Sequence, residues 1–178
     1  MQKKQKAKAK YTGYVATSID GRIAKSGNSG VDWTSREDWN FFQKSLNNSD
    51  AVIVGHNTFK ASNSRLRLRN TIVITSKVSK QKTAGKVVFI NPKNIDVKKF
   101  VEKQDFKKIA VIGGSHIYDF CLQNKILDEL FVTIEPYVFT KGVPMFSGKA
   151  FKKFRFSLKS VKHFNKKGTI LLHYKNEN

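Results

Sequence analysis

The most constraining stretch of this chain is a short apolar run followed by two glycines and the expected start of a helix. Ile109–Ile112 are four consecutive apolar residues, with lysines before them and Gly113-Gly114 after them. A run this short, containing two isoleucines and a valine, predicts a strand buried on both faces. Ser115 is placed to cap a helix that carries four residues on its inner side: Ile117, Tyr118, Cys121 and Leu122.

A strand, a glycine pair and a helix N-terminus form a corner that suits a phosphate. The free N–H groups and the helix dipole both favour negative charge there. The alternative is a plain structural turn, because many α/β proteins connect a strand to a helix through glycines and bind nothing at that point.

Length and composition indicate one folded domain. The chain has 178 residues, 39% of them apolar, and 14 phenylalanines, which is enough to bury a proper core. No apolar run approaches the roughly 20 residues of a membrane span, and no apolar segment follows the N-terminal lysines as in a secretory signal. Cys121 is the only cysteine, so no disulfide can form within the chain. We therefore expect a cytoplasmic location and no membrane partner.

The net charge of +21 is the most unusual feature of the composition. Residues 1–10 are predicted to be a disordered basic tail before a single domain at 11–178; its lysines are Lys3, Lys4, Lys6, Lys8 and Lys10. Removing these five charges leaves +16. Such a surface attracts polyanions, but the basic residues are scattered, so nucleic acid is expected to bind only non-specifically.

Strands and helices alternate through most of the chain, which predicts a mostly parallel α/β sheet. Eight strands are expected at Tyr11–Thr17, Ala51–Val54, Thr71–Thr75, Lys86–Ile90, Ile109–Ile112, Asp128–Glu135, Lys153–Phe164 and Thr169–Lys175. The last two should form a hairpin around Asn165–Gly168, so that the C-terminal strand runs antiparallel. Four helices are expected to flank the sheet: one capped by Thr34 or Ser35, one after Gly55, one at Ile95–Lys103 and one after Gly113-Gly114.

Three strand ends should lie together. In open α/β sheets ligands bind beyond the carboxyl ends of the strands. Gly55, Thr75-Ser76 and Gly113-Gly114 all fall at such ends. Three phosphate-compatible corners on one edge favour a dinucleotide site more strongly than one corner does. Lys25–Asp32, Asn63–Arg69 and Pro136–Gly148 are predicted to be loops, the first of them mobile.

Several separated motifs, in this order, resemble the dihydrofolate reductase family in the wide sense that includes the reductase domain of riboflavin biosynthesis. The resemblance runs from about residue 11 to residue 174. The motifs are residues 16–23, 33–38, 52–59, 66–69, 71–76, 111–114 with Tyr118, and 128–133. The resemblance implies a dihydrofolate reductase-like fold and a reduction of a small substrate, by a monomer or homodimer without a metal.

The resemblance implies that Asp38 is the single active-site acid, since it follows Trp33 by five residues, and it counts Trp33 and Thr133 with Asp38 as the catalytic residues. A carboxylate there accepts two hydrogen bonds from a pterin edge and helps to supply a proton. Thr133 matches the threonine that orients the acid, and Phe42 would stack on the pterin. The alternatives are an acidic pair, Glu37 and Asp38, that merely stabilises a helix N-terminus, and an ordinary strand threonine.

For the rest of the substrate, the resemblance implies contacts from Leu66, Arg69 and Ile112. Arg69 matches the arginine that clamps the carboxylate of the folate tail, a bidentate role that lysine fills less well. Leu66 would pack on the aromatic linker. The open alternative is a solvated basic loop formed by Arg65, Arg67 and Arg69.

For the cofactor, the resemblance implies NADPH. Fifteen residues would contact it: Ala16 and Ile23 at the nicotinamide; Gly55, His56, Asn57, Thr58, Gly113, Gly114, Ser115, His116, Ile117 and Tyr118 around the pyrophosphate; and Thr75, Ser76 and Lys77 at the 2′-phosphate. Hydroxyl donors with a lysine favour the phosphorylated dinucleotide. In this family the paired glycines often have a cis peptide bond between them.

The sequence also departs from the family pattern. His56 stands where many folate-reducing members have a phosphate-binding arginine, and Val31-Asp32 replaces an apolar-proline pair. The turn at residues 18–22 resembles the riboflavin branch, but Tyr14, Ile112 and Asn63 replace that branch's lysine, acid and substrate-contacting aspartate. We therefore expect a dihydrofolate reductase. The alternatives are a riboflavin-pathway pyrimidine or other pteridine reductase, and a basic nucleic-acid-binding protein on this scaffold.

Overall fold

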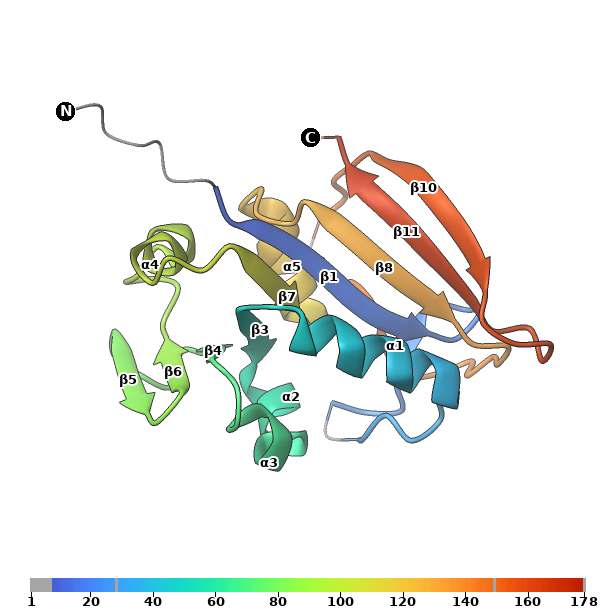
Figure 1. The fold of residues 1–178 in the computed structure, drawn as a ribbon, viewed down its shortest axis with the longest axis horizontal. Coiled ribbons are helices and arrows are strands. Elements are labelled where there is room, and N and C mark those ends of the chain that lie inside the picture. Colours follow the sequence, from blue (N-terminus) through green and yellow to red (C-terminus); the bar gives the residue numbers. More distant parts are fainter. Residues whose placement is uncertain (1–7, 28, 149, 178) are drawn as a thin grey trace.

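The computed structural model describes residues 8–27, 29–148 and 150–177, and its main feature is a twisted nine-stranded sheet (Figure 1). The strand order is β10-β11-β8-β1-β7-β3-β4-β6-β5, and β2 and β9 form a separate small sheet. The strands are β1 Lys10–Thr17, β2 Arg22–Ala24, β3 Ala51–Gly55, β4 Thr71–Ile74, β5 Gln81–Ala84, β6 Val87–Ile90, β7 Lys108–Val111, β8 Glu129–Ile134, β9 Val143–Pro144, β10 Phe156–His163 and β11 Ile170–Asn176.

The helices cover both faces of this sheet. They are α1 Arg36–Asn47, α2 His56–Ala61, α3 Asn63–Leu66, α4 Val97–Lys103 and α5 Ser115–Gln123. The first three contribute to one buried apolar cluster through Leu46, Phe59 and Leu66. The last two contribute to the opposite cluster, for example through Val101 and Cys121. Figure 1 accordingly shows α1 in front of the sheet and α5 behind it.

The centre of the sheet is parallel, as the sequence predicted. β8, β1, β7, β3, β4 and β6 pair in parallel, whereas β11 runs antiparallel to β8. All residues of β4, and β3 up to Val54, are buried, which fits the short runs of β-branched residues that predicted them. The expected hairpin is also confirmed, with Gly168 at a φ of 101° in its turn.

Several details of the sequence prediction are wrong. The main sheet has nine strands rather than eight, because Gln81–Ala84, expected as a connection, pairs with β6 as an antiparallel edge strand. Part of the loop predicted at Pro136–Gly148 forms β9, which pairs with β2. A fifth helix, the single turn α3, lies in the expected basic loop. These segments have only two to four residues each, so neither period 2 nor period 3.6 marks them.

The N-terminus of α1 is capped as predicted, whereas that of α5 is not. Ser35 caps α1, and its side-chain oxygen accepts a hydrogen bond from the Asp38 amide. Ser115, in contrast, is not a cap: Gly114 occupies the N-cap position of α5, and the Ser115 hydroxyl donates instead to the Pro144 carbonyl. The inner side of α5 is as predicted, since the four residues named for it are buried.

The N-terminal prediction is only partly testable. Residues 1–7 of the predicted tail lie outside the described residues. Lys10, at its end, belongs to β1 and forms an ion pair with Glu129 at 2.9 Å. Within the described residues, no helix has the length and apolar character needed to cross a membrane.

The centre of the sheet should dominate stability. Ile53 is fully buried in β3 between β4 and β7. Its replacement by alanine leaves a cavity in a close-packed core and should lower the free energy of unfolding by about 2–5 kcal/mol, measured by urea denaturation. Val161, half-exposed on the edge strand β10, is the matched control. Val161→Ala should change stability by less than about 0.5 kcal/mol, and equal losses would contradict this assignment.

Candidate functional site

A cavity of about 730 Å³ opens along the carboxyl ends of the central strands. Every predicted site residue except Trp33 and Gly113 lines it: Ala16, Ile23, Asp38, Phe42, Gly55, His56, Asn57, Thr58, Leu66, Arg69, Thr75, Ser76, Lys77, Ile112, Gly114, Ser115, His116, Ile117, Tyr118 and Thr133. The three corners expected at one sheet edge thus meet in one space. The parallel order β7-β3-β4 is the cause, because it brings their ends together.

Asp38 is the buried carboxylic acid of this cavity. It lies in the first turn of α1 and is 8% exposed. Burial raises its pKa, and the charge of Glu135 acts in the same direction. Hydrogen bonds from Thr133 and Thr34 oppose this rise. An acid in such surroundings keeps its proton to a higher pH than an exposed aspartate, which suits a proton donor.

Thr133 is placed beside Asp38 by the sheet. It is 1% exposed, near the end of β8, and pairs in register with Ala16 of β1. The parallel pairing of β1 and β8 therefore places Ala16, which lines the cavity, next to Thr133, which hydrogen-bonds Asp38. The geometry agrees with the orienting role that the resemblance implies.

A row of aromatic rings forms the wall near Asp38. Tyr14 stacks on Phe131 with ring centroids 5.5 Å apart and nearly parallel planes. Phe41 meets Phe131 edge-on at 5.4 Å, and His173 stacks on its other side at 4.1 Å. Phe131 was not predicted as a site residue. The sequence does contain a signal for it: residues two apart in a strand lie on the same face, so Phe131 shares the face of Thr133.

The far end of the cavity is basic. The Arg69 guanidinium donates a 2.7 Å hydrogen bond to the Asn47 side chain, which anchors it against the end of α1. The Arg65 guanidinium lies 4.7 Å from the ring centre of Trp39. Leu66, between these arginines in sequence, is buried. Arg65 and Trp39 also line the cavity, and neither is among the site residues predicted from the sequence.

The glycine corner is closely packed. The Gly55 amide donates to the Gly113 carbonyl at 2.8 Å, and the Gly113-Gly114 peptide bond is cis, as the resemblance implied. Gly113 has a φ of +92°, and a Cβ there would lie 3.0 Å from the Tyr118 ring. The Tyr118 hydroxyl in turn donates to the Tyr14 carbonyl at 2.6 Å. Gly113 therefore supports the cavity from behind, and Gly114 lines it.

Two helix N-termini point into this corner without a side-chain cap. Gly55 and Gly114 are the N-cap residues of α2 and α5, and neither helix start has a side-chain hydrogen bond. Nearby, Nδ1 of His56 is buried without a hydrogen-bond partner in the described protein. Burial lowers the pKa of His56, and the charges of Lys77 and Lys60 lower it further. Unsatisfied donors and clustered cations suit an anionic ligand.

Trp33 has a different surrounding from the one expected. Its ring packs edge-on against Phe139 with centroids 4.8 Å apart. Its Nε1 is buried and has no hydrogen-bond partner among the described residues. Trp33 precedes Asp38 by five residues in the sequence, but unlike Asp38 it does not line the cavity.

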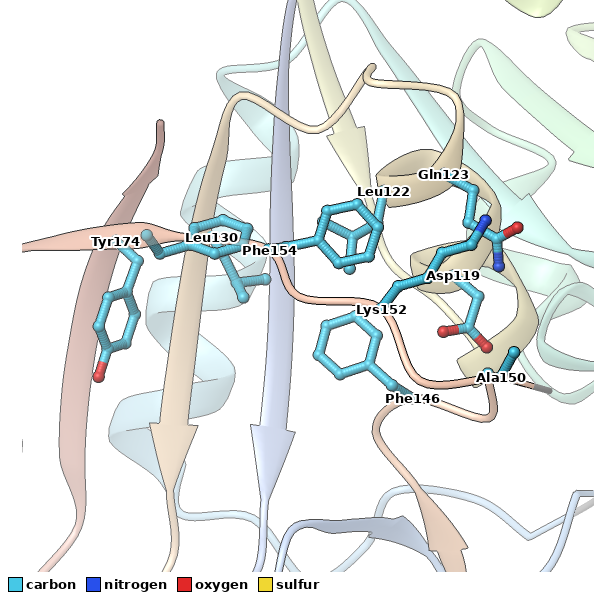
Figure 2. Close-up of a pocket in the computed structure, with 11 residues that line it drawn as sticks. Asp119, Leu122, Gln123, Leu130, Phe146, Ala150, Lys152, Phe154 and Tyr174 are labelled. Carbon is cyan, nitrogen blue, oxygen red and sulfur yellow. The ribbon is translucent and has the colours of Figure 1, made fainter. Parts of the chain in front are cut away.

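A second cavity of about 380 Å³ lies on the α5 side of the sheet. Figure 2 shows it between α5, the strands of the C-terminal half and the segment before β10. Its wall is mainly aromatic and aliphatic: Leu122, Leu130, Phe146, Phe154, Phe156 and Tyr174. Asp119, at its edge, accepts two hydrogen bonds from Ser147. No predicted site residue lines this cavity, so the candidate site is the larger one.

The sequence profile of one protein family, dihydrofolate reductase, matches residues 14–173. The chain belongs to the dihydrofolate reductase family. This confirms the resemblance, and the reductase activities of the family are the starting point for its function. No curated protein sequence matches the chain significantly.

Solved structures of reductases have the same fold. A pyrimidine reductase-like protein from Corynebacterium diphtheriae is 18% identical, with a TM-score of 0.74 over 96% of this chain and 92% of its own. Acinetobacter baumannii RibD is 16% identical, with a TM-score of 0.78 over 96% of this chain and 59% of its own. Dihydrofolate reductase from Enterococcus faecalis, complexed with NADP(H) and RAB-propyl, is 21% identical. Its TM-score is 0.65 over 97% of this chain and 99% of its own.

The raised pKa of Asp38 has a consequence for stability. The folded protein binds the Asp38 proton more tightly than the unfolded chain does, so ionising this carboxyl destabilises the fold at a pH above its folded pKa. Asp38→Asn should therefore be more stable than the parent at pH 7 in urea unfolding. The advantage should vanish as the pH falls below about 4, the unfolded value.

The control for this prediction is the adjacent, exposed Glu37, whose pKa is lowered by a backbone hydrogen bond and by Asn165. Because its pKa is lowered in the folded protein, the ionised Glu37 favours the folded state, whereas the ionised Asp38 opposes it. Glu37→Gln should therefore show no gain in stability at pH 7. A parent protein that is more stable than Asp38→Asn at neutral pH would contradict the burial argument.

Proposed function

We propose that the protein catalyses the NADPH-dependent reduction of 7,8-dihydrofolate to 5,6,7,8-tetrahydrofolate. The observation that carries the proposal is the buried Asp38 carboxyl, with its raised pKa, in a cavity that Arg69 also lines. Reduction of a pterin needs a proton at the ring, and a folate tail needs a cation for its carboxylate. One cavity lined by both groups meets both requirements.

Asp38 would bind the amino-pyrimidine edge of the pterin through two parallel hydrogen bonds and assist protonation of the ring nitrogen. Thr133 would hold the carboxyl in the orientation for this contact. The apolar and aromatic wall, including Phe42 and Phe131, would exclude water and contact the flat ring. The protein groups thus bind, orient and move a proton.

The residues present fit NADPH, which supplies the hydride when bound. The uncapped N-terminus of α5, with the close glycine contact beside it, would receive the pyrophosphate. Thr75, Ser76 and Lys77 would hold the 2′-phosphate, and the unpartnered Nδ1 of His56 lies in the same cavity. His56 and the lysines around it would replace the phosphate-binding arginine of many folate-reducing members.

The second candidate is the pyrimidine reduction of riboflavin biosynthesis, which is favoured by the higher structural similarity to proteins of that pathway. The substrate-side residues favour dihydrofolate instead. Tyr14 and Ile112 line the cavity where the riboflavin branch would have a lysine and an acid. An apolar wall without these charged groups suits the ring of a pteridine with a benzoyl-glutamate tail better than a phosphoribosylamino-pyrimidine.

The deciding experiment follows NADPH oxidation by absorbance with each substrate. Turnover with dihydrofolate and none with the ribosylated pyrimidine is expected. The absence of turnover with dihydrofolate at micromolar enzyme would reject the proposal, and turnover with the pyrimidine alone would establish the second candidate. Tight binding of random oligonucleotides at physiological salt, measured by fluorescence anisotropy, would favour the non-enzymatic alternative.

Asp38→Asn should reduce kcat for dihydrofolate by about 100- to 10,000-fold near neutral pH, the range for loss of a general acid. The defect should shrink at low pH, because solvent then protonates the substrate without help from Asp38. Stopped-flow rates across pH measure this, with Glu37→Gln as the neighbouring control. An unchanged rate would mean that another group is the acid.

Arg69→Ala should raise KM for dihydrofolate by about 10- to 100-fold, since a charge-assisted bidentate contact contributes about 1.5–3 kcal/mol. A dihydropterin without the glutamate tail should show no such change. Arg69→Lys should restore little, because lysine lacks the planar fork. Arg67→Ala, on the same segment but outside the cavity lining, is the control. An equal effect on the tail-less substrate would contradict the tail contact.

A further inference from the structure

Glu135 is a buried carboxylate for which the proposed reaction has no use. It follows the last residue of β8 and is 2% exposed, and it is among the largest fully buried side chains of the protein. A buried carboxylate is unfavourable unless it is hydrogen-bonded or paired. Its partners therefore indicate what it does.

Both oxygens of Glu135 accept short hydrogen bonds from distant parts of the chain. The Ser35 amide donates to Oε1 at 2.6 Å. The Thr169 hydroxyl donates to Oε2 at 2.7 Å and accepts from the Asn165 side chain at 3.0 Å. One carboxylate thus joins the end of β8, the start of α1 and the C-terminal hairpin.

The contact to Ser35 lies next to the acid. Ser35 is the N-cap of α1, and its hydroxyl accepts from the Asp38 amide at 3.3 Å. Two residues before Glu135, the Thr133 side chain hydrogen-bonds the Asp38 carboxyl. The end of β8 therefore holds α1 at its cap and at its acid, so both contacts fix where the acid lies.

We propose that Glu135 is a positioning residue for Asp38: its carboxylate fixes the first turn of α1 against β8 and the C-terminal hairpin. The same contacts hold the carboxylate close to the start of the helix that carries the acid. The catalytic meaning of this assignment rests on the proposed function. Glu135 does not line the cavity, so it would contact neither dihydrofolate nor NADPH bound there.

The charge of Glu135 acts on Asp38 in a defined direction. A like charge disfavours ionisation, so it adds to the effect of burial in raising the pKa of Asp38. Titratable groups on the surrounding elements include Glu37 on α1, which is exposed and influenced by Lys167 and Arg36, Tyr14 on β1, whose pKa burial raises, and His173 on β11, which stacks on Phe131. Within the described residues, Glu135 is the charged group that acts on Asp38.

A purely structural cap differs from this proposal in one measurable respect. If Glu135 only capped the helix, its replacement would change the stability of the protein but not the pH at which Asp38 titrates. A positioning residue with an electrostatic effect would also move the Asp38 titration, and with it the alkaline limb of the rate profile.

Glu135→Gln separates the two, because it keeps the shape and removes the charge. Carbon-13 NMR of the ligand-free protein, with Asp38→Asn to assign the signal, should show the Asp38 midpoint falling to lower pH, since a like charge beside it has been removed. The limb of kcat that falls with rising pH should move in the same direction. Exchange of the Ser35 amide should accelerate by about tenfold, as a charge-assisted hydrogen bond becomes a neutral one.

Thr169→Val is the matched control, since it removes the bond to Oε2 and leaves the Glu135 charge in place. Its Asp38 midpoint should stay at the parent value. An unchanged midpoint in Glu135→Gln would overturn the proposal, and so would an equal shift in Thr169→Val.

Glu135→Asp covers the case in which the glutamine variant does not fold. It retains the charge but shortens the reach, so the Asp38 midpoint should remain raised while the Ser35 amide exchanges faster. Parent-like exchange in this variant would overturn the proposal. The NMR and exchange readouts need no substrate, so a failure of the dihydrofolate assay would leave them interpretable.

Discussion

The close approach of β3 and β7 at their carboxyl ends is the constraint on which the site depends. The Gly55 amide reaches the Gly113 carbonyl at 2.8 Å, and a Cβ on Gly55 would lie 3.0 Å from the Ile117 side chain. A Cβ on Gly55 would require the Ile117 side chain to shift, and Gly113 adopts a φ of +92°, which favours glycine, so the two glycines suit this close approach. Because they do, two uncapped helix N-termini open into the same cavity, and a single ligand can contact both.

The two faces of the sheet have separate tasks. The cluster beneath α4 and α5 is continuous and contains most of the buried aliphatic residues, so it supports the strands from behind. The face beneath α1 is less filled, and its aromatic row and Asp38 leave the larger cavity. A rigid rear layer thus allows an open front layer, which is how a small domain keeps a site of this size.

Most of the fold and much of the site could be predicted from the sequence, for identifiable reasons. Central strands such as Ala51–Val54 are short, β-branched and fully buried, so they give a clear signal. β5 and β9 gave no such signal, since β5 is mostly polar, β9 has only two residues, and both depend on pairing with a neighbouring strand. Residues tied to a family motif, such as Thr133, were found. Glu135 was not, because its partners Ser35 and Thr169 lie 100 and 34 residues away and no local pattern reports such contacts.

The C-terminal hairpin has a consequence for the order of folding. The parallel centre of the sheet is complete once β8 has paired with β1, but the cap of α1 is tied through Glu135 to Thr169, at the start of β11. During synthesis the core can therefore assemble before the acid reaches its final place, since N-terminal parts emerge first. The hairpin follows β8 and α1 in the sequence, so the contact of Thr169 with Glu135 can form only after the parts of the sheet that it joins have been synthesised.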